Sequence, residues 1–401
     1  MIAATLDIDH AAAVAWDAVV IGAGPAGAAA AIRLARRRRR VLLVDRAAFP
    51  RPKVCGCCLS PAAVRELSAL ELPAERSPRR VPLDAIWVAA AGREARIAVS
   101  GGATVSREAL DTALVHAAID AGAAWLPEAT VTTVAEADVG ATATLHGPTA
   151  APATLRAGIV VIAAGLADAV RIRPGSAPTA PVETSRPRRV ARKSFIGLGA
   201  TLPADAGTLA AGQLVMAVGR AGYTGIVRLE DGRIDVAAAV DPAAVSTLGA
   251  SAAVIDTILT EVGGIARRSV ARDGLAAAAI RATPRLTHTT PLIASRRGTI
   301  LRIGDAAAYV EPFTGEGIGW ALASARVLAG ALLADPSAID CSTRFANAHA
   351  RVFAAHHARC RRVAAFVRRP WLAAGAVHAA RLAPAIAARV VPWIVGGGRL
   401  R

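Results

Sequence analysis

A glycine-rich turn between a short apolar strand and an alanine-rich helix limits what this chain can fold into more than any other feature. The turn is Gly22-Ala23-Gly24-Pro25-Ala26-Gly27, which follows the apolar residues 18–21 and opens a helical pattern that runs to Leu34. A second apolar strand, 41–44, ends at Asp45, 23 residues after Gly22. Strand, helix and strand in this length are typical of a βαβ unit with parallel, buried strands. The sequence therefore predicts an α/β fold with a Rossmann-like first domain.

Each glycine of this turn has a physical role in a dinucleotide-binding site. Gly22 permits the tight turn, Gly24 lets a pyrophosphate approach the backbone, and Gly27 lets the helix pack closely on the strand. The N-terminus of the helix faces the phosphates, and Asp45 is placed to accept hydrogen bonds from the adenosine ribose. An ordinary glycine turn of an α/β domain is the less favoured alternative, because strand, helix and acid are all in register.

Composition excludes several other classes of protein. Hydrophobic residues make up 54% of the 401 residues and charged residues 19%, a balance that disordered chains do not have. Five cysteines are too few for a disulfide scaffold. We expect no membrane-spanning helix, because a charge, a Pro or a polar run interrupts every stretch of about 18 residues. Residues 1–17 hold no Lys or Arg, which a secretory signal needs, so we expect a cytoplasmic protein.

The formal net charge of +17 does not by itself indicate nucleic-acid binding. All the cationic residues except Lys53 and Lys193 are arginines, and they are scattered along the chain. Aromatic residues, on which single-strand binders stack bases, are only 3% of the chain. The densest run, 36–40, ends a helical pattern, where cations oppose the negative end of the helix dipole. We therefore expect no nucleic-acid partner.

The middle of the chain has the texture of an antiparallel sheet. Alternating runs occupy 214–218, 225–229 and 234–239, and Asp231-Gly232 between two of them is a strong hairpin signal. We therefore predict a second domain built on a mostly antiparallel β-sheet, followed by a helical C-terminal tail. The predicted limits are 15–80, 105–170 and 286–335 for the first domain, 81–104 and 171–285 for the second, and 336–401 for the tail.

A second glycine motif indicates which dinucleotide the first domain binds. Gly304-Asp305 follows an apolar strand, 299–303, and is itself followed by the segment 312–319, Pro-Phe-Thr-Gly-Glu-Gly-Ile-Gly. An Asp at this point can bond a ribityl hydroxyl, and the helix that begins near Gly317 would direct its positive end at a flavin ring. A nicotinamide fold needs no such element, so the pair of motifs indicates a flavin.

These motifs resemble the FAD-dependent oxidoreductases with the p-hydroxybenzoate hydroxylase fold, and most closely the geranylgeranyl reductase family. The resemblance rests on the stretches 20–27, 45–46 and 304–322, on Arg107 with Asp111, and on Phe49-Pro50-Arg51-Pro52-Lys53-Val54-Cys55-Gly56. It implies FAD as cofactor and a substrate between the second sheet and the flavin. The implied FAD-binding residues are Gly22, Gly24, Pro25, Ala26, Gly27, Asp45, Arg46, Lys53, Arg107, Gly304, Asp305, Gly315, Gly317 and Ile318.

The chain departs from that family at two points. The family's usual Asp-Gly motif near the middle strand is here Ala163-Ala164-Gly165, without an acid, which puts direct reduction by NAD(P)H in doubt and leaves ferredoxin as the other electron donor. The aromatic substrate motif Tyr-x-Trp-x-Phe-Pro is replaced by Gly222-Tyr223-Thr224-Gly225-Ile226. A polyprenyl substrate is therefore not secured by the sequence, and the Trp-x-Trp-x-Ile-Pro signature of tryptophan halogenases is absent too.

The cysteine cluster Cys55-Gly56-Cys57-Cys58 has several interpretations. A zinc site would need a second Cys or His pair at suitable spacing, which the sequence lacks, so we predict no metal. Cys55 and Cys58 form a Cys-x-x-Cys, which can be redox active. The resemblance places Cys55 beside the flavin, where its thiol could donate a proton or contact substrate. Packing of small residues against the ring is the remaining alternative.

Outside these motifs, Tyr223 and the tail are candidates for function. Tyr223 lies in a predicted glycine-flanked turn over the flavin, where substrate contact and packing are equally favoured. The histidines form no triad or metal pattern, so we interpret them as structural or solvated. Residues 367–401 alternate apolar residues with arginines, a pattern that suits contact with an anionic membrane surface or docking against the first domain.

The sequence thus predicts an FAD-dependent oxidoreductase that reduces a double bond of a lipophilic substrate, with Cys55 and Tyr223 as catalytic candidates. The alternative is a flavin-dependent monooxygenase that hydroxylates an aromatic or polyketide-type substrate. The fold supplies positioning and electrostatics for either reaction, because the flavin carries the redox chemistry.

Overall fold

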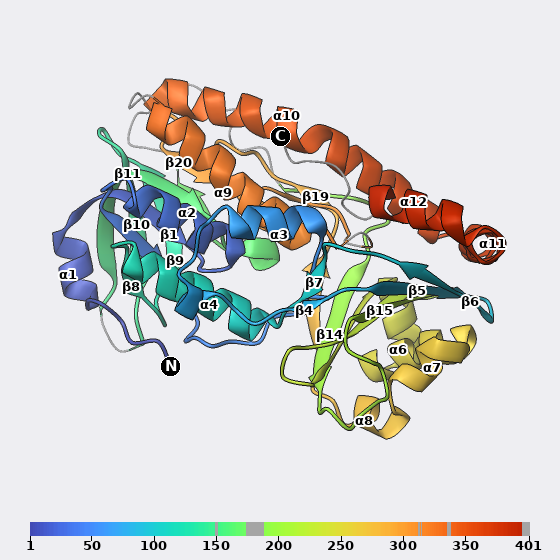
Figure 1. Cartoon of the computed structure of the whole chain (residues 1–401). Coiled ribbons are helices and arrows are strands. Elements are labelled where there is room, and N and C mark those ends of the chain that lie inside the picture. Colours follow the sequence, from blue (N-terminus) through green and yellow to red (C-terminus); the bar gives the residue numbers. More distant parts are fainter. Residues whose placement is uncertain (149–150, 174–187, 312, 314, 335–337, 395–401) are drawn as a thin grey trace.

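In the computed structural model, the chain forms two large sheets side by side, with long helices across one face of the pair (Figure 1). The structure describes all residues except 149–150, 174–187, 312, 314, 335–337 and 395–401. The expected boundary at 335–336, Pro312 and Thr314 of the second glycine motif, and the end of the tail lie outside the described residues. The α/β architecture predicted from the sequence is confirmed.

The first sheet contains the predicted βαβ unit. Strand β1 (Ala15–Ile21) lies between β2 (Val41–Val44) and β11 (Ala153–Ile162) and pairs in parallel with both. The end of β11 also pairs in parallel with β20 (Ile300–Arg302), which therefore ends at the same edge as β1. The other strands are β8 (Ala124–Leu126), β9 (Thr130–Glu136), β10 (Ala141–His146) and β12 (Arg171–Arg173).

Helices α2 (Pro25–Ala35), α4 (Arg107–Asp120) and α9 (Gly317–Ala334) pack together over one face of this sheet. Ten of the eleven residues of α2 are buried, and most are alanines, so neighbouring helices can approach its backbone closely. Ser106 caps α4: its Oγ accepts a hydrogen bond from the N–H of Ala109 at 3.0 Å. The first core thus holds the N-terminus of α2 at the carboxyl edge of the sheet.

The second sheet is mostly antiparallel, as predicted. Its order is β18-β14-β17-β16-β15-β5-β6, and only β15 and β5 pair in parallel. The predicted hairpin joins β16 and β17, where the N–H of Leu229 donates to the carbonyl of Arg233. The strands are β5 (Ala85–Ala90), β6 (Arg93–Ala98), β14 (Ile196–Leu202), β15 (Gln213–Gly219), β16 (Gly222–Arg228), β17 (Ile234–Val240) and β18 (Arg281–Arg285).

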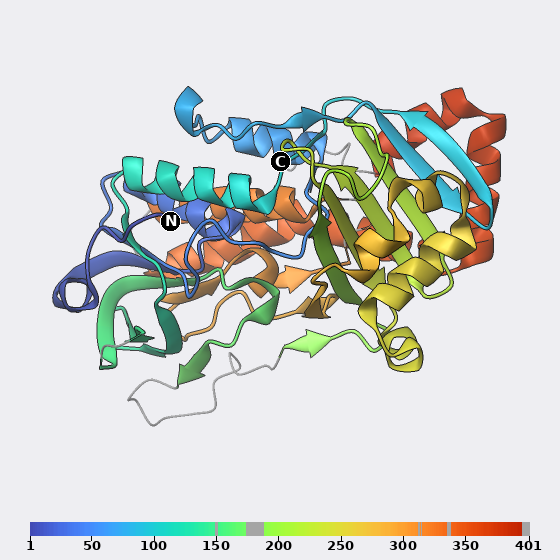
Figure 2. The same ribbon diagram turned by 90° about the horizontal axis from the view of Figure 1, so that it is seen from below.

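Four helices that the sequence analysis did not predict follow β17 and pack beneath the second sheet (Figure 2). They are α5 (Pro242–Leu248), α6 (Ser251–Val262), α7 (Gly264–Ser269) and α8 (Arg272–Ala276). Apart from α6 they are shorter than two and a half turns, so their apolar residues show no sustained helical period. Helix α6 buries Val254, Ile255 and Ile258 against β15 and β16, which leaves the opposite face of the sheet for the cavity described below.

The last part of the described chain forms three helices, α10 (Ala338–Val367), α11 (Pro370–Leu382) and α12 (Pro384–Ile394). The sequence predicted a helical tail in this region. Helix α10 packs on α9, whereas α11 and α12 pack on β6 of the second sheet. Contrary to expectation, α9 is long and apolar enough to cross a membrane, but 67% of it is buried inside the protein, where it contacts α2, α3 (Pro61–Ser68) and α10. Its apolar surface therefore belongs to the protein core.

The remaining elements are short and complete the layers. They are α1 (Ile8–Ala13), β3 (Cys58–Leu59), α3 (Pro61–Ser68), β4 (Val81–Pro82), β7 (Ala103–Thr104), β13 (Arg189–Val190), β19 (His288–Thr289), β21 (Ala308–Tyr309) and the 3₁₀ turns η1 (Ala74–Arg76), η2 (Gly165–Ala167) and η4 (Gly304–Ala306). Small sheets β3-β7-β4 and β13-β19-β21 connect the two large ones.

We predict that Gly27→Ala destabilises the protein by about 3 kcal/mol or more. A Cβ at Gly27 would lie 1.8 Å from the carbonyl oxygen of Gly22, so strand and helix would have to separate. Gly330→Ala, also in a buried helix, is the control: its Cβ meets no atom within 4 Å, and alanine favours a helix by up to about 1 kcal/mol. Urea unfolding of both variants checks this, and equal stability of the two would contradict it.

Candidate functional site

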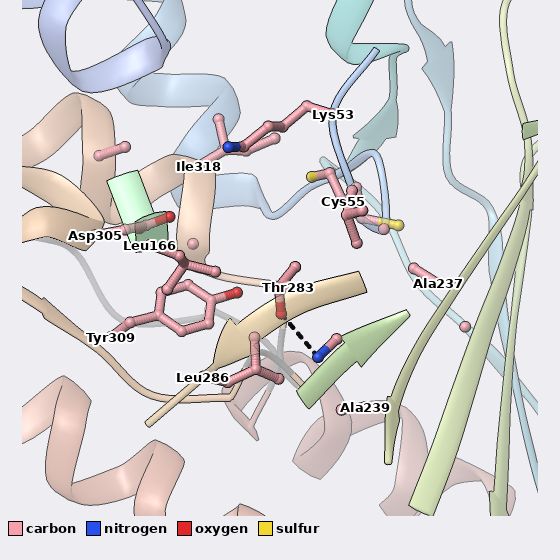
Figure 3. A pocket seen from close by; sticks show the side chains of 18 of the residues that line it. Lys53, Cys55, Leu166, Ala237, Ala239, Thr283, Leu286, Asp305, Tyr309 and Ile318 are labelled. Atoms are coloured by element: carbon pink, nitrogen blue, oxygen red, sulfur yellow. Dashed lines mark hydrogen bonds between the residues drawn. The ribbon is translucent and has the colours of Figure 1, made fainter. Parts of the chain in front are cut away.

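A cavity of about 1050 Å³ lies between the carboxyl edge of the first sheet, the second sheet and helices α9–α11. Figure 3 shows Asp305 and Tyr309 on one side of it and Ala237 and Ala239 of β17 on the other. Lys53 and Cys55 enter from the loop between β2 and β3. The predicted site residues that line it are Gly22, Gly24, Pro25, Ala26, Asp45, Arg46, Lys53, Cys55, Arg107, Tyr223, Asp305, Gly315, Gly317 and Ile318.

The first glycine turn has the backbone that only glycine adopts easily. Gly22 has φ +101°, and a Cβ there would lie 2.5 Å from the carbonyl oxygen of Ala163. Gly24 lines the cavity, and the Arg107 and Arg51 guanidinium groups lie 3.6 and 3.9 Å from its Cβ position. Gly27 does not line the cavity and instead sets the approach of α2 to β1. The turn is therefore a cradle with its open side toward two cations.

Asp45 holds this turn in place. Its Oδ2 accepts a hydrogen bond from the N–H of Ala23 at 2.7 Å, and its Oδ1 accepts one from the N–H of Ala47 at 3.0 Å. Each oxygen has a further lone pair, so the buried carboxylate can still accept a bond from a ribose, as predicted.

Two arginines and a buried aspartate form the cationic wall beside Gly24. Arg107 donates to both oxygens of Asp111 at 2.9 and 2.7 Å, and Asp111 is fully buried. Arg51 lies 3.6 Å from Asp45 and 3.7 Å from Asp111, but its buried Nε has no hydrogen-bond partner among the described residues. A buried guanidinium N–H of this kind beside the N-terminus of a helix fits a phosphate group. Arg51 was not among the site residues predicted from the sequence.

The second glycine turn lies directly against the first. Gly304 has φ +58°, and its Cβ position is 2.8 Å from the Cβ of Ala26, so the two turns touch. Gly304 does not line the cavity, whereas Asp305 does. Burial raises the pKa of Asp305 to about 6, although Arg107 and Lys53 favour its charged form. Burial, with Arg107 and Arg51 nearby, lowers the pKa of Lys53.

The buried side chain of His288 contacts the backbone of Asp305. The sequence predicted only a structural or solvated role for this histidine. Nε2 of the buried His288 lies 2.9 Å from the carbonyl oxygen of Asp305, and Arg188 contacts Nδ1 at 3.0 Å. Among the described residues, no group of three His, Cys, Asp or Glu side chains could hold a metal ion. The histidine at 288 is therefore a positioning residue for the second turn.

The cysteine loop places three thiols at different depths. Hydrogen bonding from the Cys57 thiol, assisted by the charge of Arg107, lowers the pKa of Cys55 to about 6. The same bond and burial raise the pKa of Cys57, and burial raises that of Cys58. All five cysteines of the chain are free thiols. Cys55 is therefore the reactive thiol of the cavity, and Cys57 is a protonated neighbour.

The sequence predicted Tyr223 in a turn, which is wrong: Tyr223 lies on strand β16, where it is buried. Gly222 and Gly225 lie on the same strand, and a Cβ at Gly222 would lie 2.1 Å from the carbonyl oxygen of Ala239, so a larger side chain does not fit there. The Tyr223 ring meets that of Phe313 edge to face at 5.0 Å, and the Tyr223 hydroxyl has no hydrogen-bond partner in the described part of the chain. The other tyrosine, Tyr309, also lines the cavity and was missed. The chain has only two tyrosines, so once Tyr223 was a candidate, Tyr309 could have been considered as a second one.

We predict that Cys55 is alkylated by iodoacetamide with a half-maximal rate near pH 6, because only the thiolate reacts. Cys57→Ala removes the main stabilising hydrogen bond and should move the midpoint toward that of a free cysteine. Cys341→Ala, in α10, should leave the midpoint unchanged. Mass spectrometry of the labelled peptide identifies the residue. A midpoint of the original protein near that of a free cysteine would contradict the assignment.

Solved structures similar to this one are flavoproteins. The flavin-dependent brominase Bmp2, as a triple mutant, aligns over 95% of this chain and 94% of its own with a TM-score of 0.74 and 14% identity. A geranylgeranyl bacteriochlorophyll reductase-like protein from Thermoplasma acidophilum aligns over 88% of both chains with a TM-score of 0.67 and 17% identity. At these identities the likeness establishes the fold alone.

Sequence comparison adds a short, strong match and a family. Menaquinone reductase from Mycobacterium tuberculosis is 59% identical over 56 residues, so the match spans only 14% of each protein's length. The model of the pyridine nucleotide-disulphide oxidoreductases, whose domain binds FAD, matches residues 16–225, slightly more than half of the chain. The cradle at Gly24, the two arginines and Asp305 fit that cofactor. The chain therefore belongs to the pyridine nucleotide-disulphide oxidoreductase family.

Proposed function

We propose that this oxidoreductase reduces a double bond of a lipophilic substrate, and that a menaquinone-like quinone with a long apolar chain is the first candidate. The observation that carries the proposal is the lining of the cavity. Beyond the FAD cradle and Cys55, in the part that we call the apolar arm, most lining residues are apolar side chains of the second sheet and of α11, such as Ile86, Val88, Leu214, Met216, Val218 and Val377. Helix α10 adds Val363, Phe366 and Val367 together with Arg359 and Arg362, and β18 adds Arg281 and Thr283.

The FAD is held, in this proposal, by the groups that already surround the cradle. Its pyrophosphate is bound by Gly24, Arg51 and Arg107, its adenosine ribose by Asp45, and its ribityl chain by Asp305. The residues Gly315, Gly317 and Ile318 at the start of α9 contact the ring, and Arg46 and Lys53 line the same end of the cavity. FAD, when bound, supplies hydride transfer between an electron donor and the substrate.

The apolar arm orients the substrate and excludes water. Transfer of a hydrocarbon chain from water stabilises the complex by about 0.8 kcal/mol for each buried CH₂ group. The geranylgeranyl reductases have an aromatic substrate motif that this chain lacks. The edge-to-face pair of Tyr223 and Phe313 supplies aromatic side chains to the cavity in its place. We therefore assign Tyr223 to substrate contact in the arm. A hydroxyl without a partner leaves it free to donate to a carbonyl of the substrate.

Reduction of a double bond also requires a proton, and the Cys55–Cys57 pair can hold it. Because the pKa of Cys57 is raised, its thiol stays protonated when Cys55 is a thiolate. The pair therefore keeps one proton on a sulfur at neutral pH. Cys55 is the member that lines the cavity, so we propose that the proton passes from the Cys57 thiol to Cys55 Sγ and from there to the substrate. A proton taken up from water then restores the Cys57 thiol.

Two relatives support a reductase over the monooxygenase alternative. The strong local match is to a menaquinone reductase, and one similar structure is geranylgeranyl reductase-like. The brominase and a probable FAD-dependent monooxygenase from Pseudomonas aeruginosa share the fold at 14% and 19% identity. Ala164 stands where the geranylgeranyl reductase family has an acid, and this difference puts direct reduction by NAD(P)H in doubt. We therefore propose either NAD(P)H or ferredoxin as the electron donor.

We predict that Arg51→Gln weakens FAD binding about 10- to 100-fold, because a hydrogen bond to a charged group contributes about 1.5–3 kcal/mol. Arg37→Gln removes an exposed arginine away from the cavity and is the matched control. Titration of the protein without cofactor by FAD, followed through flavin fluorescence, gives both affinities. If Arg51→Gln bound FAD as tightly as the control, the assignment of the pyrophosphate site would be wrong.

We predict that Cys55→Ala lowers the rate of substrate reduction by about 10²–10⁴, the usual contribution of a general acid, without weakening FAD binding. Cys58→Ala is the control, because the pKa of its thiol is raised by burial and it does not take part in the pair. The measurement is anaerobic turnover of a menaquinone with NADPH, NADH or reduced ferredoxin. Unchanged turnover would remove Cys55 from the mechanism.

The same assay separates the two candidate reactions. Without oxygen, a reductase consumes one NADPH or NADH, or two one-electron equivalents of reduced ferredoxin, for each reduced substrate. Substrate-dependent oxygen uptake with a hydroxylated product, and no anaerobic turnover, would replace the reductase by the monooxygenase.

A further inference from the structure

We propose that the outer face of α11 and α12 docks on an anionic lipid bilayer, and that the mouth of the cavity between α10 and α11 takes up the substrate from that bilayer. The second part rests on the proposed function, and the first part does not. Figure 1 shows α11 and α12 together at the far end of α10, beside β5 and β6.

Large apolar side chains are exposed on these two helices. Trp371 is 71% exposed, Leu382 73% and Ile386 63%. On α11, Trp371 and Leu382 are eleven residues apart, which is three turns, so they share one face. The opposite face buries Ala373 and Val377 against the second sheet. The helix thus has two apolar faces, of which the fold covers one.

The charge around this face has a single sign. From Cys341 to Ile394 the chain contains nine arginines and no Asp or Glu. Arg361, Arg369, Arg381 and Arg389 are exposed. Exposed cations on β6, the strand beneath α11 and α12, add to them at Arg93 and Arg96, of which Arg96 pairs with Asp84. Arginines near anionic lipid each add attraction, and Trp suits the boundary between headgroups and acyl chains.

The cavity opens beside the same face. Arg362, Phe366 and Ala376 line the cavity and are also exposed, Phe366 by 40%. Ala373, Val377 and Ala380 of α11 continue the wall inward with apolar atoms. A substrate that leaves the bilayer at α11 would therefore pass from acyl chains to an apolar wall without crossing water.

Other occupants fit this face less well. In a symmetric dimer the face would meet itself, and arginines without acids would repel one another. A nucleic acid would attract the arginines but would leave Trp371, Leu382 and Ile386 in contact with phosphate and water. An anionic bilayer satisfies both the apolar residues and the charges.

The test is co-sedimentation of the FAD-loaded protein with vesicles of phosphatidylcholine alone, or of phosphatidylcholine and phosphatidylglycerol in equal parts. We expect binding to the anionic vesicles and little to the neutral ones. Arg381→Gln with Arg389→Gln should lower binding about 30-fold. The control, Arg37→Gln with Arg39→Gln, removes the same charge from an exposed run elsewhere and should bind as the original protein does.

A second pair of variants tests the apolar contact. Trp371→Ser with Leu382→Ser should release the protein from anionic vesicles. The control Val139→Ser changes an apolar residue that is 91% exposed between β9 and β10, and it should not release the protein. None of the arginine and serine variants alters a residue that lines the cavity. Equal binding to both kinds of vesicle, no binding, or binding unaffected by both variant pairs would overturn the proposal. So would a dimer in solution that the serine variants dissociate.

Turnover separates this proposal from the proposed function. The serine variant should lose activity on a menaquinone embedded in anionic vesicles and keep it on the same quinone dispersed in detergent. Vesicle binding without turnover in either form would contradict the proposed function and leave the docking face standing. Equal turnover of the variant and the original protein on embedded quinone would contradict uptake from the bilayer.

Discussion

The contact between the Gly304 turn and the N-terminus of α2 is the one on which the rest of this structure depends. The Cβ position of Gly304 lies 2.8 Å from the Cβ of Ala26, so a side chain at 304 would force the two segments apart. The parallel pairing of β20 with β11, and of β11 with β1, brings these distant turns to one sheet edge. Ligands bind at such an edge because strand ends and helix N-termini converge there.

Electrostatics then decides what that edge can hold. Arg51 and Arg107 approach Gly24, and the buried Asp111 keeps both in position. Arginine tolerates this setting because its charge is delocalised and it is never deprotonated. An additional anionic group can therefore be accepted without leaving a buried charge unpaired. Arg107 also favours the thiolate of Cys55, so the cofactor end and the thiol end of the cavity are electrostatically linked.

The second sheet contributes mainly apolar surface. Most of its residues that line the cavity are apolar, the exceptions being Tyr223 on β16 and Arg281 and Thr283 on β18, and its other face is covered by α6 and α7. Helices α11 and α12 extend that apolar wall to the surface, where arginines surround it. One cavity therefore joins the cofactor cradle, the apolar part that we propose for a lipophilic substrate, and the surface at α11.

The sequence by itself determined the βαβ unit, its glycine turn and the hairpin at Asp231-Gly232, because each depends on residues close together in the chain. Period, glycine placement and the acid at Asp45 carry that local information. The tertiary structure alone decided that α5–α8 are helices beneath the sheet, that Tyr223 is on a strand, and that Arg51, Tyr309 and His288 serve the site. Those outcomes depend on packing between distant segments, which local patterns do not encode.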